Sequence, residues 1–343
     1  MEEGVDEKAV KTMLKHLIEF LCYWLGLDSL FYLLNKHSKR IITFHNVLPD
    51  ALMDGLPRVG CMDTVADFGH IIQEVGRRFK FSTDLSDAKS ATITFDDGLV
   101  SQYEIAGEIL SSQNIPAILF VVGDAIGATP EVSLVTDRLI IWTYFAPDEA
   151  VKVAFGEVIP RESLWVKHVQ PAYRADWQNR GSVFLAKLEG IYPIKEILAM
   201  LPPEWVRLRL SGVTRRQLDD LRCRGWLIGW HTKSHFPLGM LDYAGKLEEL
   251  SSPEEYRKVV LSYPYGDIGS VGEESHKLAE ELGYPCAVSN EPDYSSARGP
   301  FFMTRMALSP NKYELHFVLS GLKYFLKYRR LLPVVKFCDS GEL

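Results

Sequence analysis

Two acidic residues and two histidines have the types and the spacing of a metal-dependent hydrolytic site. Asp96 and Asp97 are adjacent, and His231 and His235 lie four positions apart. Two imidazoles at this spacing share one face of a helical turn and can bind one cation, and a carboxylate would complete a site with room for water and substrate. Each pair also has an ordinary interpretation, because aspartate before glycine is a common turn and loop histidines are often unrelated. Since neighbouring side chains at a strand end point to opposite sides, the two aspartates can have different tasks.

Two further features could take part in the same chemistry. The segment Tyr263–Gly266 (YPYG) is a turn in which proline fixes the backbone and glycine permits a tight return. A backbone N–H in this turn could stabilise an oxyanion, although a simple strand-to-loop turn has the same sequence. His45 could donate a proton near neutral pH, although a lone histidine is more often structural.

Each of these features directly follows a segment that predicts a buried strand. Short apolar and β-branched runs predict strands over 40–44, 91–95, 117–122, 226–230, 258–262 and 286–289. Helical patterns lie over 64–79, 100–112, 214–224, 271–282 and 311–328. Strands that alternate with helices indicate a parallel sheet or barrel, and barrels of this kind build their active sites after the carboxyl ends of the strands.

The alternating pattern loosens between about residues 128 and 211. This stretch is rich in tryptophan, tyrosine and proline and contains helical pieces, so we expect an insertion that forms a lid or wall over a site. The predicted organisation is a helical N-terminal extension (1–38), a barrel (39–310) that carries this insertion, and a C-terminal helix packed on the barrel (311–343).

The apolar stretch 17–34 has two interpretations. It is interrupted by Glu19 and Asp28 and is too short for a membrane-spanning helix. Its leucines recur at helical spacing, which favours one or two amphipathic helices packed on the domain. The alternative is a membrane-surface contact through residues 8–36. The N-terminus is acidic, unlike the start of a secretion signal, so a cytoplasmic or peripheral membrane location is expected.

Composition excludes some classes of function. The 343 residues carry a formal net charge of -7, and no basic stripe with interleaved aromatic residues is present, so nucleic acid is not an expected partner. The five cysteines are scattered and form no CxxC pair. They are interpreted as reduced, mostly buried thiols, which favours a reducing compartment.

Taken together and in this order, the motifs resemble those of the polysaccharide deacetylase (NodB-homology) family, also called carbohydrate esterase family four. The run 94–98 (TFDDG) resembles its first motif, 228–235 (IGWHTKSH) its metal motif, and 263–266 its third motif. The resemblance spans roughly residues 40–308. It implies an α/β fold, a distorted (β/α)7-type barrel, here with an N-terminal helical extension and a partly helical insertion.

The resemblance also implies roles for individual residues. Asp97, His231 and His235 would bind one divalent cation, zinc in the first place, with cobalt or nickel as alternatives. Asp96 would be the general base. The oxyanion site would be the turn with Pro264 and Tyr265, and the N–H of Tyr265 would be the donor.

Two departures from the family pattern change these roles. Ser262 stands where the third motif often has an arginine, and the late motif with a histidine acid is not visible, since His316 sits inside a helical pattern. The run 43–49 (TFHNVLP) instead resembles a segment of a circularly permuted branch, which implies that His45 is the general acid. Arg305 resembles an arginine near the end of related chains, with a surface ion pair as the alternative.

The expected activity is hydrolysis of an N-acyl group, acetyl in the first place, from an amino sugar in a polysaccharide or glycan precursor. The alternatives are a deformylase or hydrolase of a non-sugar amide on the same fold, and a non-catalytic carbohydrate-binding barrel. The complete set of acidic and histidine residues argues against the last. Aromatic residues of the insertion could stack on sugars, although packing is their commoner role: Trp142, Tyr144, Trp165, Tyr173 and Trp177.

Overall fold

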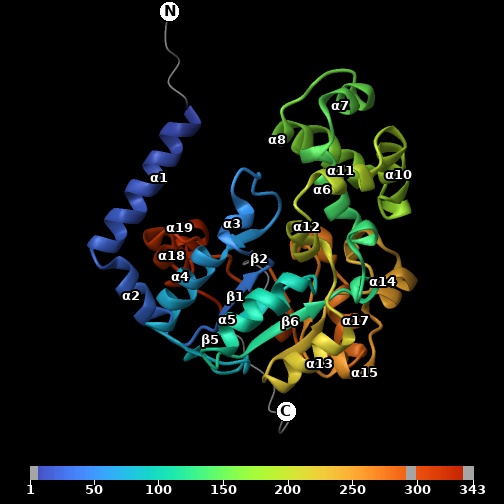
Figure 1. The fold of residues 1–343 in the computed structure, drawn as a ribbon. Coiled ribbons are helices and arrows are strands. Elements are labelled where there is room, and N and C mark those ends of the chain that lie inside the picture. The colour runs from blue at the N-terminus through green and yellow to red at the C-terminus, as the bar shows by residue number, and fades with distance from the viewer. Residues whose placement is uncertain (1–6, 291–298, 335–343) are drawn as a thin grey trace, which may run out of the picture.

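A ring of seven parallel strands forms the centre of the computed structural model, which describes residues 7–290 and 299–334 (Figure 1). In ring order the strands are β1 (Arg40–Phe44), β5 (Ser90–Phe95), β6 (Ala117–Val121), β7 (Leu227–Trp230), β8 (Leu261–Ser262), β9 (Ala287–Ser289) and β10 (Met303–Thr304). The ring closes after β10, where the N–H of Thr43 donates to the carbonyl of Met306 at 3.0 Å and the N–H of Met306 donates to the carbonyl of Ile41 at 2.8 Å. The predicted distorted (β/α)7 barrel is therefore confirmed.

The strands are buried on both faces. Successive side chains of a strand point to opposite sides, so that one set fills the barrel and the other packs against the helices outside. In β6, Ile118 and Phe120 pack inside with Val288 of β9, whereas Leu119 and Val121 belong to the outer core. This double burial explains why the strands are continuous apolar runs in the sequence.

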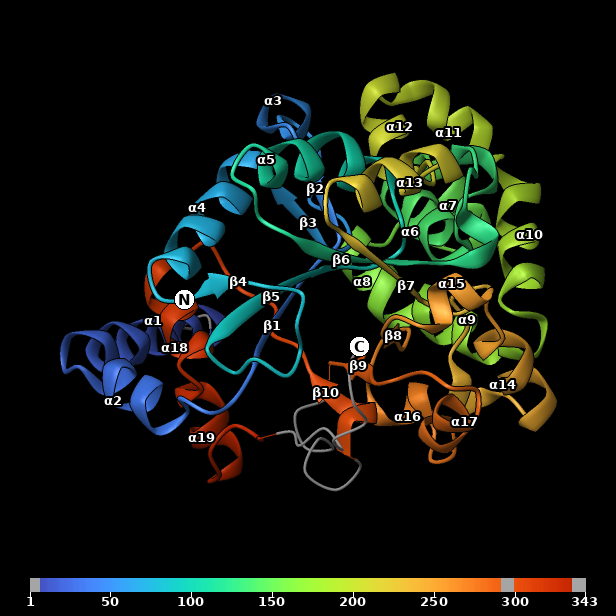
Figure 2. The same cartoon turned by 90° about the horizontal axis from the view of Figure 1, so that it is seen from below.

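Helices encircle the strands (Figure 2). The outer helices are α4 (Val65–Gly76), α5 (Gly107–Ser111), α13 (Arg215–Cys223), α14 (Tyr243–Leu250), α15 (Glu254–Arg257), α16 (Ile268–Val271) and α17 (Ser275–Glu281). A π-helical turn over Gln102–Ala106 leads into α5. A capping box begins α13, because the Thr214 hydroxyl accepts the Gln217 N–H and the Gln217 side chain accepts the Thr214 N–H.

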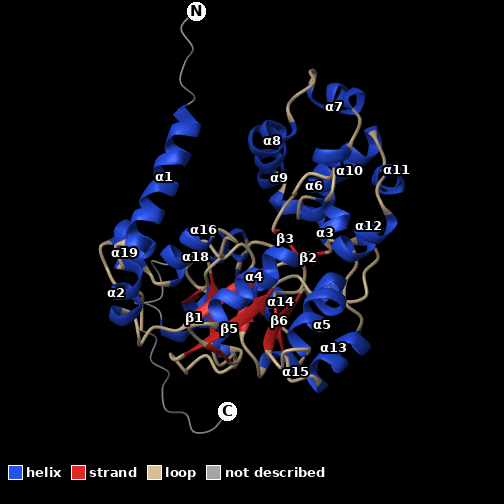
Figure 3. Ribbon diagram, turned by 60° about the vertical axis from the view of Figure 1, so that its left-hand side comes forward, coloured by secondary structure: helices blue, strands red, loops and turns tan. Residues whose placement is uncertain are grey.

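The insertion folds as a group of short helices with a core of its own. They are α6 (Val135–Phe145), α7 (Asp148–Phe155), α8 (Arg161–Leu164), α9 (Gln170–Ala175), α10 (Ser182–Ile191), α11 (Ile194–Met200) and α12 (Pro203–Leu210). Trp142 and Trp205 are fully buried there, so Trp142 is a packing residue. The same core includes side chains of β2 (Asn46–Leu48) and β3 (Met62–Thr64), which pair beside α3 (Asp50–Met53). Figure 3 shows the insertion standing over one end of the barrel.

Four helices from the two ends of the described chain lie together at one side of the barrel (Figures 1 and 2). They are α1 (Glu7–Trp24), α2 (Leu27–Leu34), α18 (Lys312–Leu319) and α19 (Leu322–Tyr328). Phe20 and Tyr23 of α1 contact Tyr313 of α18, with ring centroids 5.2 and 5.4 Å apart. The single helix predicted over 311–328 is wrong, because Gly321 adopts a φ of +86° and separates α18 from α19.

Some other elements differ from the sequence prediction. The strand predicted over 258–262 is reduced to β8, because the N–H groups of Lys258 and Val259 donate back to carbonyls of α15 in the turn that ends this helix. The helix predicted over 271–282 begins only at Ser275, since Gly272 has a φ of +76° and ends α16. The two-residue strands β4 (Lys80–Phe81) and β10 are absent from the prediction, because two residues carry no alternation to detect.

Candidate functional site

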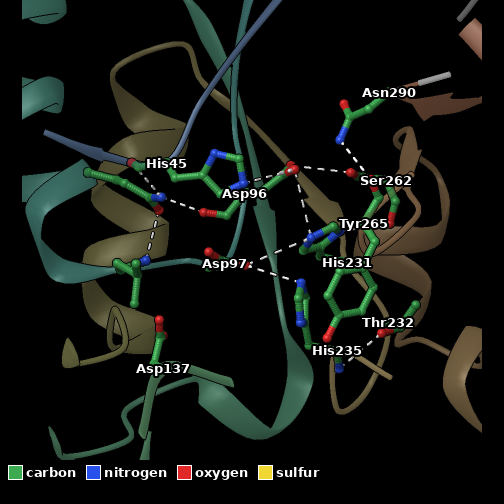
Figure 4. Close-up of polar contacts among 12 residues, drawn as sticks. His45, Asp96, Asp97, Asp137, His231, Thr232, His235, Ser262, Tyr265 and Asn290 are labelled. Carbon is green, nitrogen blue, oxygen red and sulfur yellow. Dashed lines mark hydrogen bonds and ion pairs between the residues drawn. The ribbon is translucent and has the colours of Figure 1, made fainter. Parts of the chain in front are cut away.

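Residues from four separate strands meet at one end of the barrel (Figure 4). His45 follows β1, Asp96 and Asp97 follow β5, and His231 follows β7, while Ser262 is the last residue of β8. Because all strands of the ring are parallel, their carboxyl ends lie at the same end of the barrel. The fold therefore brings together side chains that lie more than 200 positions apart in sequence.

Asp97, His231 and His235 are arranged to hold a cation. Each offers one ligand atom, and these atoms all lie within 4.8 Å of one another. The Nε2 atoms of His231 and His235 are 3.8 and 3.5 Å from Oδ1 of Asp97, and this oxygen is buried and accepts no hydrogen bond. One carboxylate oxygen and two imidazole nitrogens are a common ligand set for zinc and similar divalent ions, so the residues fit the predicted metal site.

His231 is fixed in the form that a ligand requires. Its Nδ1 lies 2.8 Å from the carbonyl oxygen of Ser262, which positions the N–H on Nδ1 and leaves Nε2 toward Asp97. Burial lowers the pKa of His231 to about 4, although the negative charge of Asp96 opposes this shift. The imidazole is therefore neutral near pH 7 and has a lone pair for a cation.

The loop that carries the two histidines is not the predicted helical turn. Thr232 and His235 have φ values of +65° and +58°, which no helix contains. The His235 N–H donates to the Thr232 hydroxyl at 3.1 Å, so the loop closes on itself and brings both imidazoles to Asp97. The four-residue spacing thus brings both imidazoles to one carboxylate, but through a closed loop and not through a helical turn.

Glu249 of α14 holds this loop from behind. Its carboxylate is fully buried and accepts hydrogen bonds from the N–H and the hydroxyl of Ser234 at 2.8 and 2.5 Å. Its carbonyl accepts the N–H of Lys233 at 3.0 Å. Arg180, from the insertion, lies 3.0 Å from the same carboxylate. Sequence reasoning missed Glu249, because nothing in its local pattern distinguishes it from the neighbouring exposed glutamate.

Asp96 is held by Arg305, which is distant in sequence but directly follows β10 at the same end of the barrel. Nη1 and Nη2 of Arg305 donate to Oδ1 and Oδ2 of Asp96, each at 2.6 Å, and the Ser262 hydroxyl donates to Oδ1 at 3.2 Å. Burial raises the pKa of the Asp96 carboxyl, but the charge and hydrogen bonds of Arg305, together with the nearby His231 and His45, outweigh burial and hold this pKa well below its usual range. The alternative of a surface ion pair for Arg305 is wrong, because its side chain is buried.

Asn290 connects Arg305 to the proline turn. Its Oδ1 accepts from Nε of Arg305 at 3.2 Å, and its Nδ2 donates to the carbonyl of Tyr265 at 3.1 Å. Sequence reasoning missed Asn290. A usable signal existed, because Asn290 directly follows β9, just as His45, Asp96 and His231 each follow a strand.

The proline turn places Tyr265 beside the histidines. The Gly266 N–H donates to the Pro264 carbonyl at 2.7 Å, and Tyr265 between them has a φ of +62°. The Tyr265 ring lies 5.0 Å from that of His235, and its hydroxyl is 3.1 Å from the hydroxyl of Tyr173 in the insertion. The insertion therefore reaches the site through Tyr173, as well as through Arg180.

His45 lies on the other side of Asp96 from His231 (Figure 4). Its Nε2 is 3.8 Å from Oδ2 of Asp96, and the side chain is half-buried. The carbonyl of His45 accepts a hydrogen bond from Gln102 at 3.0 Å, and Gln102 also donates to the carbonyl of Asp96. Gln102 therefore links the ends of β1 and β5.

Backbone strain is concentrated at this site. Seven described residues other than glycine have a positive φ, and four of them are Asp97, Thr232, His235 and Tyr265. Such conformations cost about 1–3 kcal/mol each and persist only where surrounding contacts impose them. The contacts of Glu249 with Ser234 and of Asn290 with Tyr265 hold the two loops that carry three of these four residues.

The sequence matches no protein-family profile and no curated protein. Several solved structures resemble the chain. The deacetylase PplD of Streptococcus pyogenes, in complex with acetate, is 14% identical, with 82% of this chain and 96% of that chain covered and a TM-score of 0.49. IcaB of Ammonifex degensii is 13% identical, with 83% and 97% covered and a TM-score of 0.46. A polysaccharide deacetylase of Bacillus cereus is 12% identical, with 82% and 68% covered and a TM-score of 0.48.

Proposed function

We propose that this protein is a metal-dependent amide hydrolase that removes an acyl group, acetyl in the first place, from the nitrogen of an amino sugar in a polysaccharide or glycan precursor. One observation carries the proposal. A three-residue ligand cluster lies directly beside a buried, ionised carboxylate, Asp96, and a further imidazole, His45, lies on the other side of that carboxylate. Amide hydrolysis requires a base that activates water and an acid that protonates the leaving amine, and both kinds of group lie beside the ligand cluster.

In this proposal Asp97, His231 and His235 hold one divalent cation, with zinc preferred over cobalt or nickel. When bound, the cation lowers the pKa of water toward about 7 and polarises a carbonyl oxygen. The neutral state of His231 and the unpartnered oxygen of Asp97 support this assignment. Ser262 and Glu249 orient the ligands from behind.

Asp96 acts as the general base and accepts a proton from the attacking water. Arg305 keeps the carboxylate ionised and fixes the direction of both oxygens through its paired hydrogen bonds. Arg305 would therefore perform the role of the arginine that the third motif often has at the position of Ser262. The Ser262 hydroxyl adds a hydrogen bond to the same carboxylate.

His45 acts as the general acid and donates a proton to the leaving amine. Its partly exposed position lets it exchange protons with solvent between turnovers. The backbone N–H of Tyr265 stabilises the negative charge that develops on the acyl oxygen. The positive φ of Tyr265 and the hydrogen bond from Asn290 to its carbonyl fix the orientation of this turn.

The substrate class rests on the motifs. The runs 94–98, 228–235 and 263–266 resemble those of polysaccharide deacetylases, in which the acyl group is an acetyl amide on a sugar. An assay with both acyl groups distinguishes acetyl from formyl substrates, because a formyl group is smaller than an acetyl group and fits any space that holds acetyl.

A release assay tests the proposal. Purified full-length protein is incubated with a panel of N-acetyl and N-formyl amino sugars and their oligomers, and acetate and formate are measured with and without a chelator. We expect acetate release that the chelator abolishes and that added zinc restores. Formate release alone would identify a deformylase. Protein that carries no metal and releases neither acid would support the non-catalytic binder instead.

A further inference from the structure

Helix α1 has its polar side toward the protein and its apolar side toward solvent. Lys15 pairs with Glu314 of α18 at 2.6 Å, and Glu19 is only 1% exposed beneath the helix. On the opposite side Met13 and Trp24 are 68% and 67% exposed. A helix that packs on a soluble domain normally has the reverse orientation, with its apolar stripe inward. The apolar residues that predict packing on the domain therefore face away from it.

Helix α2 extends this apolar surface. We define the outward face as the exposed apolar side chains of α1, α2 and the turn between them, chiefly Met13, Leu17, Leu21, Trp24, Leu25 and Leu33. Among the described residues no single helix is long and apolar enough to cross a bilayer, and α1 and α2 meet that test only as a pair bent by 72°. Exposed apolar patches of this kind are rare on monomeric proteins and mark interaction sites.

Basic residues border the outward face. Residues 10–39 and 312–330 contain nine lysines and arginines but only three acidic residues, in a chain whose net charge is -7. Two of the three acids, Glu19 and Asp28, are buried. Helix α19 lies against α2, where the rings of Phe31 and Phe325 are 4.9 Å apart. Helix α19 and the segment after it therefore bring four exposed cations to the neighbourhood of α2: Lys323, Lys327, Arg329 and Arg330.

We propose that the outward face binds the surface of a lipid bilayer that contains anionic headgroups. The apolar side chains of α1 and α2 enter the boundary between headgroups and acyl chains, and the basic border contacts lipid phosphates. The bend between the helices and the packing of α1 on α18 favour contact from one side over insertion across the bilayer. A second copy of this chain fits less well, because a self-complementary contact through this face would bring two basic borders together.

Vesicle co-sedimentation of the full chain tests the proposal. The probes are large unilamellar vesicles of phosphatidylcholine alone and of phosphatidylcholine mixed with phosphatidylglycerol. We expect the protein to sediment with the mixed vesicles, to bind the neutral vesicles more weakly, and to lose this preference at high salt. Absence of binding to either kind of vesicle would overturn the proposal.

Three polar substitutions on α1 identify the surface involved. The combined variant Met13→Gln, Leu17→Gln and Trp24→Gln should weaken vesicle binding by at least about tenfold, because it removes much of the apolar area available to the bilayer. Circular dichroism and acid-release activity should be unchanged, since these side chains point into solvent and lie outside the catalytic site. Retention of full binding by this variant would contradict the proposal.

The insertion offers a matched control. Val153, Val166 and Val183 are 71%, 60% and 58% exposed, so they resemble the α1 residues in exposure but lie in other helices. Their combined replacement by glutamine should leave vesicle binding intact. A loss equal to that of the α1 variant would show that binding is unspecific and would overturn the assignment.

Two more measurements separate lipid from the other occupants. Arg329→Glu with Arg330→Glu should abolish the preference for anionic vesicles, and an unchanged preference would refute the role of the basic border. Light scattering of the wild type without lipid should show a monomer. A dimer that the α1 variant dissociates would assign the outward face to a second copy and would overturn the proposal.

Discussion

Two buried histidines of this protein, His231 and His316, lie next to carboxylates but in different settings. His316 uses both ring nitrogens: Nδ1 lies 2.9 Å from the Tyr32 hydroxyl and Nε2 lies 3.3 Å from Glu74. His231 uses one nitrogen, Nδ1, on a backbone carbonyl, while Nε2 faces Asp96 and Asp97 at 3.8 Å without a hydrogen bond. Burial lowers the pKa of both histidines.

The difference between them separates a structural cluster from a functional one. At His316 the hydrogen-bonding capacity of the ring is fully used, so the residue ties α2, α4 and α18 together. At His231 two imidazole nitrogens and a carboxylate oxygen converge without forming hydrogen bonds to one another. Such an arrangement is costly unless a ligand binds there. Among the described residues, Asp97, His231 and His235 form the one group that meets the geometric test for a metal. Burial and charge alone would not have distinguished the two histidines.

The largest expected effect comes from removing each histidine in turn. His231→Ala should lose bound metal and all chelator-sensitive activity, because one of three ligands is gone. His316→Leu should keep metal and activity but lower the free energy of unfolding by about 1–3 kcal/mol, because Tyr32 and Glu74 lose a buried partner. Metal analysis, acid-release assays and denaturant unfolding measure these changes. Loss of metal in the His316 variant would break the comparison.

Substitutions of the two neighbouring aspartates test whether the groups around His231 have separate roles in catalysis and in metal binding. Asp96→Asn should lower kcat by about 10²–10⁴-fold while metal remains bound, because the base is lost and the ligands are kept. Asp97→Asn should weaken metal binding itself. Metal content measured beside kcat distinguishes the two effects. An Asp96→Asn enzyme with most of its activity would refute the assignment of the base.

Two adjacent glutamates test whether the hydrogen bonds of Glu249 to the loop of His231 and His235 contribute to metal affinity. Glu249→Gln should weaken metal affinity by about 10–100-fold, because the buried carboxylate that accepts two bonds from Ser234 loses its charge. Glu248→Gln is the matched control, since Glu248 is exposed and pairs with Lys233 at the surface. Competition with a chelating dye gives both affinities. Equal affinities in the two variants would show that Glu249 has no role in holding the ligands.

The smallest effect is expected from replacing the arginines that pair with Asp96, beside His231, and with Glu74, beside His316. Arg305→Met removes the charge that holds the pKa of Asp96 low, so this pKa must rise and the base becomes protonated at higher pH. The acid limb of kcat/KM should therefore move upward by about one pH unit or more. Arg77, which pairs with Glu74 beside His316, is the control, and Arg77→Met should leave the profile unchanged. A fixed acid limb in the Arg305 variant would mean that another group controls it.

Much of the site could be predicted from sequence because each of its main residues follows a strand. The strands at 40–44, 91–95 and 117–122 match β1, β5 and β6 closely, since fully buried strands give unbroken apolar runs. Glu249 and Arg180 could not be predicted, because they act on the ligand loop from a helix and from the insertion. The partner of Arg305 could not be predicted either, because this residue follows the last strand and reaches Asp96 only when the barrel closes.

The sequence by itself determined the alternating fold, the candidate metal ligands and the order in which the strands present them, because these depend on local pattern and on parallel strand direction. Only the tertiary structure decided that Arg305 pairs with Asp96, and that Glu249 holds the loop that carries His231 and His235. It also decided which side of α1 faces solvent. Helical periodicity shows that a helix has two faces, but the direction each face points depends on neighbours that are distant in sequence.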